Sequence, residues 1–333
     1  MNIESIGEFG LINRFKDSFN HLVPKDFTGI GDDCAIVPNE KFDYLLSTDM
    51  LVENIHFVLN SITPYQLGYK SLAVNLSDIA AMGGEPIGSF LSISVPKGFP
   101  VEYLDEFFKG YHQLSETFGV PLLGGDTTKS AAGVAINVTI FGKCPKGEAL
   151  KRSAAKAGDK IFVTGTLGDS SIGLDALARK ASGHHFLDFL IKKHYEPTPR
   201  IHEGIWLRNQ ESVHAMIDIS DGIASDLKHV VQASKVSAEI QLNYLPTSYA
   251  LNEIAEAFEV NPLNYSLIGG EDYELLFTVA QEDADNIRNG FKLRFGEDIT
   301  EIGVIKEGGN GIVWKMDEEE VEVNLEGFNH FNA

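Results

Sequence analysis

The sequence predicts an α/β (α+β) protein built of two domains. Strand-like and helix-like patterns alternate along the chain, and Gly and Pro separate them. A locally basic segment at residues 142–159 is short of hydrophobic residues, as linkers between domains are. The chain has 333 residues, a length that suits one large domain or two of ordinary size, and its hydrophobic fraction of 43% is ample for a packed core.

The first half of the chain predicts the element order β, α, β, α, β, β. The first predicted helix opens at Pro64 and stops at the Gly83–Gly84 pair, and the second, with aromatic residues on one face, covers residues 101–118. The predicted strands are apolar or alternating runs at residues 44–47, 88–95, 120–123 and 134–141.

A second alternation of strands and helices follows the linker. We expect a helix from about Asp169, and another helix before the strand-like run AMIDIS at residues 215–220. The other strands of this half are expected at residues 161–165, 238–242, 274–279 and 311–314. The predicted boundary near residue 146 divides the chain into an N-terminal domain, residues 1–146, and a C-terminal domain, residues 147–333.

The acidic composition excludes some classes of protein. The chain carries 27 Lys+Arg against 48 Asp+Glu, a formal net charge of −21, so nucleic acids and anionic membrane surfaces would be repelled. We therefore expect no nucleic-acid partner and no membrane partner. The sequence has no secretory signal pattern and no apolar run of roughly 18 to 20 residues, and Cys34 and Cys144 are too few for a disulfide framework. These features predict a cytoplasmic protein.

Several aspartates share one local pattern, in which an apolar run is followed by a small polar residue or Gly and then by Asp. They are Asp32, Asp33, Asp49, Asp78, Asp126, Asp218 and Asp221. We predict them at the carboxyl ends of strands or in turns beside glycine, where ligand sites of open α/β sheets form. Taken singly, each has a plainer role in a turn or a helix cap, and Asp221 would serve as an N-cap.

Convergence of these carboxylates would need positive charge to offset their repulsion and desolvation. Oxygen ligands favour hard cations, and Mg²⁺ typically takes one or two carboxylates together with substrate phosphates. The spacing is unlike an EF-hand, and no His or Cys pair accompanies the aspartates as zinc would require. Neither a P-loop nor the protein-kinase motifs occur. The sequence therefore favours a distributed Mg²⁺ site for phosphoryl chemistry.

Other segments offer groups for a phosphorylated organic ligand, each with an ordinary alternative. The run at residues 124–128 could bring amides and hydroxyls to a phosphate, whereas Arg152 suits either a nucleotide phosphate or a solvated surface. A lone His such as His56 is more often structural than functional. Residues 269–273 (GGEDY) suit a cationic or polar organic group, or they simply end a helix and begin a strand.

Together these motifs resemble the thiamine-monophosphate kinase family of the aminoimidazole-ribonucleotide-synthetase-like superfamily. The resemblance covers nearly the whole chain, and the ordered set of motifs is more specific than any one of them. In order they are GEFGLI, GIGDDCA, STDMLVENIHF, KSLAVNLSDIAAMGG, GGDTT, VTGTLGDSSIGL, IDISDGIASDL, GGEDYELLFT and GFNHF. The resemblance implies a homodimer in which the mixed sheets of the N-terminal domains join in a barrel, and a C-terminal α/β domain that completes the nucleotide and substrate site.

The resemblance also implies the reaction, in which ATP donates its γ-phosphoryl group to thiamine monophosphate by direct in-line transfer assisted by several Mg²⁺ ions. The implied metal ligands are Asp33, Ser47, Thr48, Asp49, Asp78, Asp126, Asp218 and Asp221. The implied ATP contacts are Phe108, Gly125, Asp126, Arg152 and Ser220. The implied contacts to thiamine monophosphate are His56, Glu271 and Phe328. No acid or base residue is expected, because the attacking phosphate oxygen is already ionised.

The departures from the family pattern are small. Phe328 stands where the family often has Trp or Tyr, and Phe108 where a Tyr also occurs, so each keeps an aromatic ring without a polar atom. Two other functions stay open at this point. One is a superfamily synthetase, against which stands the lack of a Cys/Lys or selenocysteine-type segment before GIGDD; the other is a non-catalytic nucleotide- or thiamine-binding protein.

Overall fold

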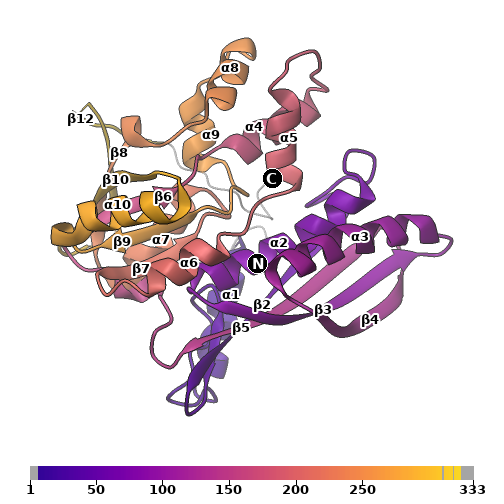
Figure 1. Cartoon of the computed structure of the whole chain (residues 1–333), viewed down its shortest axis with the longest axis horizontal. Helices are drawn as coiled ribbons and strands as arrows, with labels where there is room; N and C mark the ends of the chain where they lie inside the picture. Colours follow the sequence, from indigo (N-terminus) through magenta and orange to yellow (C-terminus); the bar gives the residue numbers. More distant parts are fainter. Residues whose placement is uncertain (1–6, 310, 318, 324–333) are drawn as a thin grey trace.

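The computed structural model describes residues 7–309, 311–317 and 319–323, and it holds two mixed sheets with helices packed on them (Figure 1). The 5-stranded sheet has the order β1-β2-β5-β3-β4, and the 7-stranded sheet has the order β12-β11-β8-β10-β6-β9-β7. The predicted α/β class is therefore confirmed. Residue 146 falls in the connection between the two sheets. None of the described helices is both long and apolar enough to cross a membrane.

Within the part of the chain that the structure describes, helices cover one face of the 5-stranded sheet and leave the other uncovered. Its strands are β1 Ala35–Pro38, β2 Phe42–Val52, β3 Glu85–Pro96, β4 Leu122–Ser130 and β5 Ala135–Pro145. Helix α2 (Pro64–Ala81) packs on β2 and β5, and α3 (Val101–Phe118) packs on α2 (Figure 1). Side chains alternate along β2, so Leu45 is buried under the helix layer whereas Leu46 is exposed on the opposite, uncovered face.

Helix α2 is the central element of the molecule. Pro64 is its first residue, and Thr63 caps it in a capping box with Gln66. The helix is buried on nearly every side because it also packs on α6 and β7 of the second half of the chain. Gly68 lets α3 approach, since a Cβ there would lie 1.8 Å from the carbonyl oxygen of Phe107.

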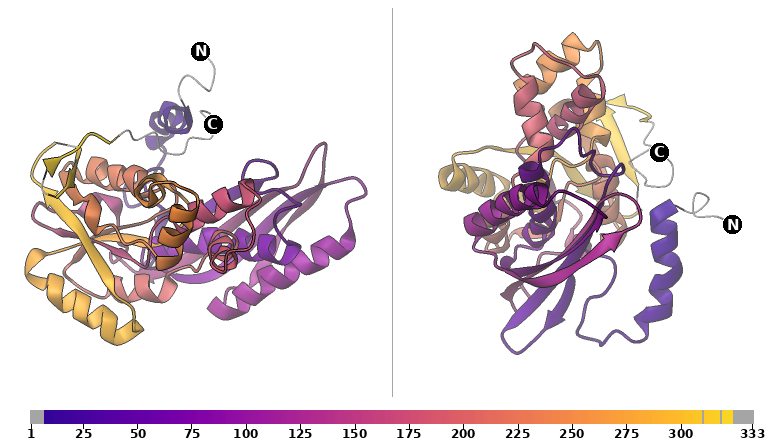
Figure 2. Two further views of the ribbon diagram at one scale, coloured as in Figure 1. Left: turned by 90° about the horizontal axis from the view of Figure 1, so that it is seen from above. Right: turned by 90° about the vertical axis from the view of Figure 1, so that its right-hand side faces the viewer.

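The 7-stranded sheet carries helices on both faces, and a smaller helical group lies beside it (Figure 2). Its strands are β6 Lys160–Thr164, β7 Val213–Asp218, β8 Ser237–Gln241, β9 Leu275–Val279, β10 Ile299–Lys306, β11 Ile312–Met316 and β12 Glu319–Glu320. The helices of this half are α4 Asp169–Ala178, α5 Leu187–Tyr195, α6 Ile201–Arg208, α7 Ile223–Ser234, α8 Tyr249–Ala257, α9 Pro262–Ile268 and α10 Ala284–Phe295.

Alternate residues of the central strands feed two hydrophobic cores. Phe162 of β6 belongs to the core that runs on beneath α2, whereas its neighbours Ile161 and Val163 face the core that holds α7. Every residue of β9 is buried, as expected for a strand covered on both faces. The first core contains residues from both sheets, so the two halves of the chain share packed hydrophobic side chains.

The structure departs from the predicted elements in identifiable ways. Helices α1 (Gly7–Asn20), α5, α8 and α10 and strands β1, β10 and β12 were not predicted. Residues 142–145 continue β5 rather than beginning a linker. The strand predicted at 120–123 instead spans Leu122–Ser130, because parallel pairing with β3 extends Gly124–Gly125, a pair that would otherwise indicate a turn. Gly125 is required there, since a Cβ would lie 1.7 Å from the Leu91 carbonyl oxygen.

Candidate functional site

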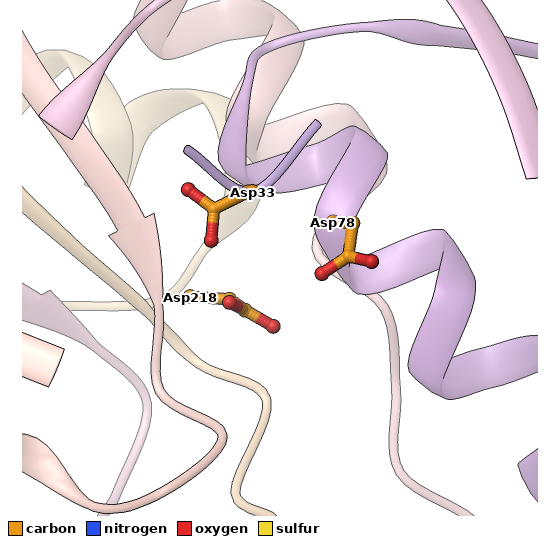
Figure 3. Close-up of side chains that lie close together, drawn as sticks. All are labelled: Asp33, Asp78 and Asp218. Carbon is orange, nitrogen blue, oxygen red and sulfur yellow. The ribbon is translucent and has the colours of Figure 1, made fainter. Parts of the chain in front are cut away.

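Three aspartates from distant parts of the chain meet beside α2. Asp33, Asp78 and Asp218 each offer a carboxylate oxygen, and these oxygens lie within 4.8 Å of one another (Figure 3). They come from the segment before β1, from the last turns of α2 and from the end of β7. The predicted convergence of carboxylates is therefore present, and Figure 3 shows the three groups turned toward a common space.

The predicted backbone positions of the aspartates were only partly right. Asp218 ends a strand as expected, whereas Asp78 lies inside α2 and Asp49 lies inside β2. The prediction that Asp221 caps a helix was wrong, because Gly222 is the N-cap of α7. Asp226 Oδ2 instead accepts hydrogen bonds from the backbone amides of Ser220 and Asp221 in this turn, at 3.1 and 3.2 Å.

Burial and nearby negative charge raise the pKa of two of these carboxyl groups. Burial, together with nearby Asp33, raises the pKa of Asp218 to about 8, although a hydrogen bond from Ser77 Oγ at 2.5 Å opposes the shift. Burial and then the neighbouring Asp49 raise the pKa of Asp78 well above its usual range. Ser47 donates a hydrogen bond to Asp78 Oδ2. A bound cation would remove much of this repulsion.

Two further predicted ligands lie beside the three central carboxylates. Burial and then the charge of Asp221 raise the pKa of Asp49 to about 6. Among charged groups, Asp49 in turn contributes most to the raised pKa of Asp78. Asp49 and Asp221 therefore extend the cluster, and Ser47 contacts it through its hydroxyl group.

Arg152 supplies positive charge to this site. Its Nη2 and Nε lie 2.6 and 3.2 Å from the two carboxylate oxygens of Asp33, a bidentate pair. Its backbone N–H also donates to Asp32 Oδ1 at 3.3 Å. Of the two sequence interpretations, the surface-exposed Arg is wrong, because only 19% of its side chain is exposed.

The donor set fits a hard divalent cation. The gathered ligand atoms are carboxylate and hydroxyl oxygens, which suit Mg²⁺ better than softer metals. Cys34 lies nearby, but burial and then the charge of Asp78 raise the pKa of its thiol well above the usual value. The thiol therefore stays protonated and is a poor metal ligand.

Two other predicted ligands lie apart from the cluster in a single chain. Thr48 follows Ser47 on β2, so its side chain points to the uncovered face, where its hydroxyl donates to Val138 O at 3.1 Å. Asp126 on β4 lies opposite Ser92 of β3, and Ser92 lies opposite Asn137 of β5. Asn137 in turn lies opposite Met50 of β2. Three strand spacings, roughly 14 Å, thus separate Asp126 from β2.

An open hollow of about 460 Å³ adjoins the cluster at the edge of the 5-stranded sheet. It is lined by the glycine-rich segment at residues 29–33 and by Ser47, Thr48 and Thr139. Phe108 is 40% exposed on α3 and packs edge-to-face on Phe107, and no described contact links it to the cluster. The hollow has the volume of a small-molecule site, and acidic side chains border it.

The segment between α9 and β9 forms another part of the site. Glu271 donates its backbone N–H to the carbonyl oxygen of Ser220 at 2.7 Å. Gly270 permits this approach, because a Cβ would lie 2.6 Å from the same oxygen. The segment is therefore not yet a strand at residue 271, and it places Glu271 next to the turn that follows Asp218.

The predicted substrate residues His56 and Glu271 lie in one neighbourhood. Burial alone would raise the pKa of Glu271, but the charge of Lys70 and its hydrogen bond, with a smaller contribution from His56, hold it below the usual value. His56 Nδ1 accepts a hydrogen bond from the Val52 amide at 3.0 Å, so the ring carries its proton on Nε2 when neutral. Phe328 lies outside the described residues.

Sequence reasoning did not identify Lys70, His194 and Asp226 as site residues. Lys70 carries the clearest signal, because it is a charged residue in the otherwise apolar run of α2. Its partner Glu271 is 201 residues away, a separation that local patterns do not bridge.

Comparison with known proteins gives consistent matches. The model of the AIR synthase related protein N-terminal domain matches residues 31–144, and that of the C-terminal domain matches residues 156–315. The thiamine-monophosphate kinase of Escherichia coli strain K12 is 40% identical over 331 residues, covering 98% of each chain. That of Buchnera aphidicola subsp. Schizaphis graminum is 40% identical over 327 residues, covering 97% of this chain and 98% of its own.

A solved structure agrees over the same length. The structure of AaThiL complexed with AMPPCP and TMP has 36% sequence identity and a TM-score of 0.87, and the match covers 99% of both chains. Two family models match most of the chain, and the alignments to relatives at 36% to 40% identity are nearly complete, so they agree on one family. The chain belongs to the thiamine-monophosphate kinase family of the AIR synthase related proteins.

Proposed function

We propose that this chain is an enzyme that transfers the γ-phosphoryl group of ATP to thiamine monophosphate, giving thiamine diphosphate and ADP. The observation that carries the proposal is the aspartate cluster of Asp33, Asp78 and Asp218, in a chain that aligns with thiamine-monophosphate kinases over 97% and 98% of its length. Clustered carboxylates bind divalent cations, and phosphates bound to such cations are the substrates that this arrangement suits.

We assign the metal sites to several Mg²⁺ ions. The proposed ligands are Asp33, Ser47, Thr48, Asp49, Asp78, Asp126, Asp218 and Asp221. When bound, the ions would neutralise charge between two anionic substrates and help to align them. The support is the all-oxygen donor set and the raised pKa values of Asp49 and Asp218, which mark carboxyl groups that lack a compensating charge.

The chain's own residues bind and orient the two substrates. Arg152 brings guanidinium donors to the cluster, where ATP phosphates would lie, and the adjoining hollow of about 460 Å³ is large enough for part of a nucleotide. The proposed ATP contacts are Phe108, Gly125, Asp126, Arg152 and Ser220. The proposed contacts to thiamine monophosphate are His56, Glu271 and Phe328. A carboxylate and an aromatic ring suit the cationic thiazolium and its neighbouring heterocycle.

Direct in-line transfer needs little else from the protein. The attacking phosphate oxygen is ionised at neutral pH, so no general base has to remove a proton. The barrier is lowered mainly by holding the two phosphates in line and by meeting the charge that spreads in the transition state.

We further propose a homodimer that joins the two 5-stranded sheets in a barrel through their uncovered faces. Leu46 and Met50 of β2 and Phe90 of β3 are 38%, 56% and 44% exposed on that face. Thr48 and Asp126, which lie apart from the cluster in one chain, are on the same face. A second copy docked on this face would therefore lie next to these two proposed ligands.

The proposed domain roles follow from this arrangement. Residues 1–146 would bind ATP and Mg²⁺ and form the dimer, and residues 147–333 would complete the nucleotide and substrate site. We also propose a cytoplasmic location, in keeping with ATP as donor and with Cys34 and Cys144, which are free and buried.

An assay of ADP release tests the proposed reaction. With Mg²⁺, ATP and thiamine monophosphate, we expect ADP and thiamine diphosphate in equal amounts, and neither product when thiamine replaces its monophosphate. Binding of both substrates without turnover would instead indicate a non-catalytic binding protein. ADP release that does not depend on thiamine monophosphate would favour a superfamily synthetase with another substrate.

A further inference from the structure

A fully buried lysine lies behind the substrate-side carboxylate. Lys70 on α2 has a side-chain exposure of 0%, and its Nζ lies 3.0 Å from Oε2 of Glu271. Glu271 comes from the other half of the chain and keeps 28% of its side chain exposed. The pair therefore has a buried cationic end and an anionic end that is open to solvent.

His194 of α5 contacts the same carboxylate oxygen. Its Nδ1 lies 3.2 Å from Glu271 Oε2 and 3.0 Å from Ser170 Oγ, and its Nε2 lies 3.5 Å from Lys70 Nζ. An ammonium group has only donors, so Nε2 is the accepting nitrogen and Nδ1 carries the proton. Burial and then the charge of Lys70 lower the pKa of His194 to about 3, so the ring is neutral.

Oε2 of Glu271 therefore accepts a hydrogen bond from Lys70 of α2 and lies against the ring of His194, which comes from a different element. The backbone of Glu271 is also fixed, because its φ of +65° is left-handed and its amide is bonded to Ser220 O at 2.7 Å. Fixed main chain and a clamped Oε2 leave the carboxylate few orientations. Such preorganisation reduces the conformational entropy that is lost when a ligand binds.

We propose that Lys70 and His194 are positioning residues for thiamine monophosphate, which hold the Glu271 carboxylate from behind so that its exposed side faces the cationic heterocycle of the substrate. This inference rests on the proposed function. Without Lys70, Glu271 would be a partly buried acid without its counter-ion, and it would take up a proton or turn toward solvent. In either case the carboxylate would attract the substrate less.

The variant Lys70→Met tests the proposal because it keeps the length of the side chain and removes its charge. We expect its KM for thiamine monophosphate to rise roughly tenfold or more, while its KM for ATP stays within about twofold. Lys70→Arg restores a cation and should recover most of the loss. His194→Leu removes the polar ring beside Oε2 and should raise the same KM by a smaller factor, roughly threefold.

A matched control comes from the preceding turn of α2. Gln66 Nε2 donates to Glu196 Oε1 of the segment after α5 at 3.1 Å, so it also joins the two halves of the chain, but it does not touch Glu271. Gln66→Leu should lower the melting temperature and leave both KM values unchanged. This control separates a loss of packing between α2 and α5 from a loss of positioning.

A double variant decides whether the effect passes through Glu271. In a Glu271→Gln background, Lys70→Met should add little to the KM for thiamine monophosphate. The inference would be overturned if Lys70→Met raised the KM for thiamine monophosphate equally in both backgrounds, or raised the KM for ATP in parallel. It would also be overturned if Lys70→Arg did not restore the KM for thiamine monophosphate. If Lys70→Met does not fold, His194→Leu carries the same comparison. Absence of turnover by the wild-type chain would contradict the proposed function, whereas normal turnover with unchanged KM in the variants would contradict only this inference.

Discussion

At the scale of single residues, the site is a balance between carboxylates and the few cations that reach them. Arg152 pairs with Asp33, whereas Asp78 receives a hydrogen bond from Ser47 and no described ion pair. Asp78 therefore depends on a bound cation more than Asp33 does.

The variant Asp78→Asn should therefore lose activity without losing its fold. The amide keeps an oxygen for the Ser47 hydroxyl, but it removes the charge that a Mg²⁺ ion would meet. We expect turnover to fall by roughly 10² or more in the ADP-release assay, with an unchanged or higher melting temperature in the absence of metal. Asp285→Asn, at an 86% exposed position of α10, is the matched control and should keep normal turnover. Substantial activity of Asp78→Asn would contradict the proposed metal site.

Stability should respond to pH and Mg²⁺ together. The folded-state pKa values of Asp49 and Asp218, about 6 and about 8, lie above the ordinary value of 3.8, so the folded chain holds more protons than the unfolded chain between these limits. Without metal, the contribution of these groups to stability is complete below pH 3.8 and is lost as the pH rises to about 8. Mg²⁺ binds the ionised forms.

We therefore expect Mg²⁺ to raise the melting temperature more at pH 8 than at pH 6, as measured by thermal unfolding at matched ionic strength. Asp218→Asn should show a smaller difference between the two pH values. An equal rise at both pH values in the wild-type chain would show that these carboxyl groups do not bind the ion.

Much of the site could be predicted at the residue scale, and the limits have physical causes. The pattern of Asp beside a small residue after an apolar run identified the aspartates that meet in the cluster. Its structural reason held for Asp218, which ends β7, but not for Asp78, which lies within α2. The sequence could not reveal Lys70, because its counter-ion Glu271 is distant in the chain. It also could not place Thr48 and Asp126, since that requires knowing which face of the sheet the helices cover.

At the scale of elements, close contact between helices decides the packing of the N-terminal half. A Cβ on Gly68 would lie 1.8 Å from the carbonyl oxygen of Phe107, so α2 and α3 would have to move apart. The predicted boundaries of α2 and α3 were accurate because Pro64, the Gly83–Gly84 pair and the apolar spacing define them locally. Strand β4 was misplaced because its conformation depends on β3 rather than on its own residues.

Gly68→Ala should destabilise the fold by roughly 1–3 kcal/mol, because the methyl group overpacks the α2–α3 interface. Chemical unfolding measured by circular dichroism would show this as a lower denaturation midpoint with a similar slope. Gly311→Ala is the control, since a Cβ there meets no atom within 4 Å, and it should change stability by less than about 0.5 kcal/mol. Equal stability of the two variants would contradict the close α2–α3 contact.

At the scale of the whole molecule, the uncovered face of the 5-stranded sheet is the clearest sign of a partner. Met50 is 56% exposed there among other apolar side chains. The overall class was predictable because alternating patterns and the break near residue 146 are properties of long stretches. The assembly is not readable from one chain's sequence pattern, since an exposed apolar strand residue resembles a buried one.

Met50→Asp should convert a dimer into monomers and lower turnover, because a charge would be placed in the proposed interface. Sedimentation velocity would report the change in mass. Leu293→Asp, at a 90% exposed position of α10, introduces the same charge elsewhere and should leave mass and turnover unchanged. A wild-type chain that sediments as a monomer would exclude the dimer.

The alternation along β2 has a consequence for how this strand can vary. Ser47 and Asp49 point toward the aspartate cluster, while Thr48 and Met50 point to the opposite face. Inserting or deleting one residue within Phe42–Val52 would exchange the two sets of side chains. Such a shift by one residue would turn the proposed metal ligands away from the cluster and change the side chains on the face proposed to contact a second copy. The length of this strand is therefore more tightly constrained than the identity of most residues in it.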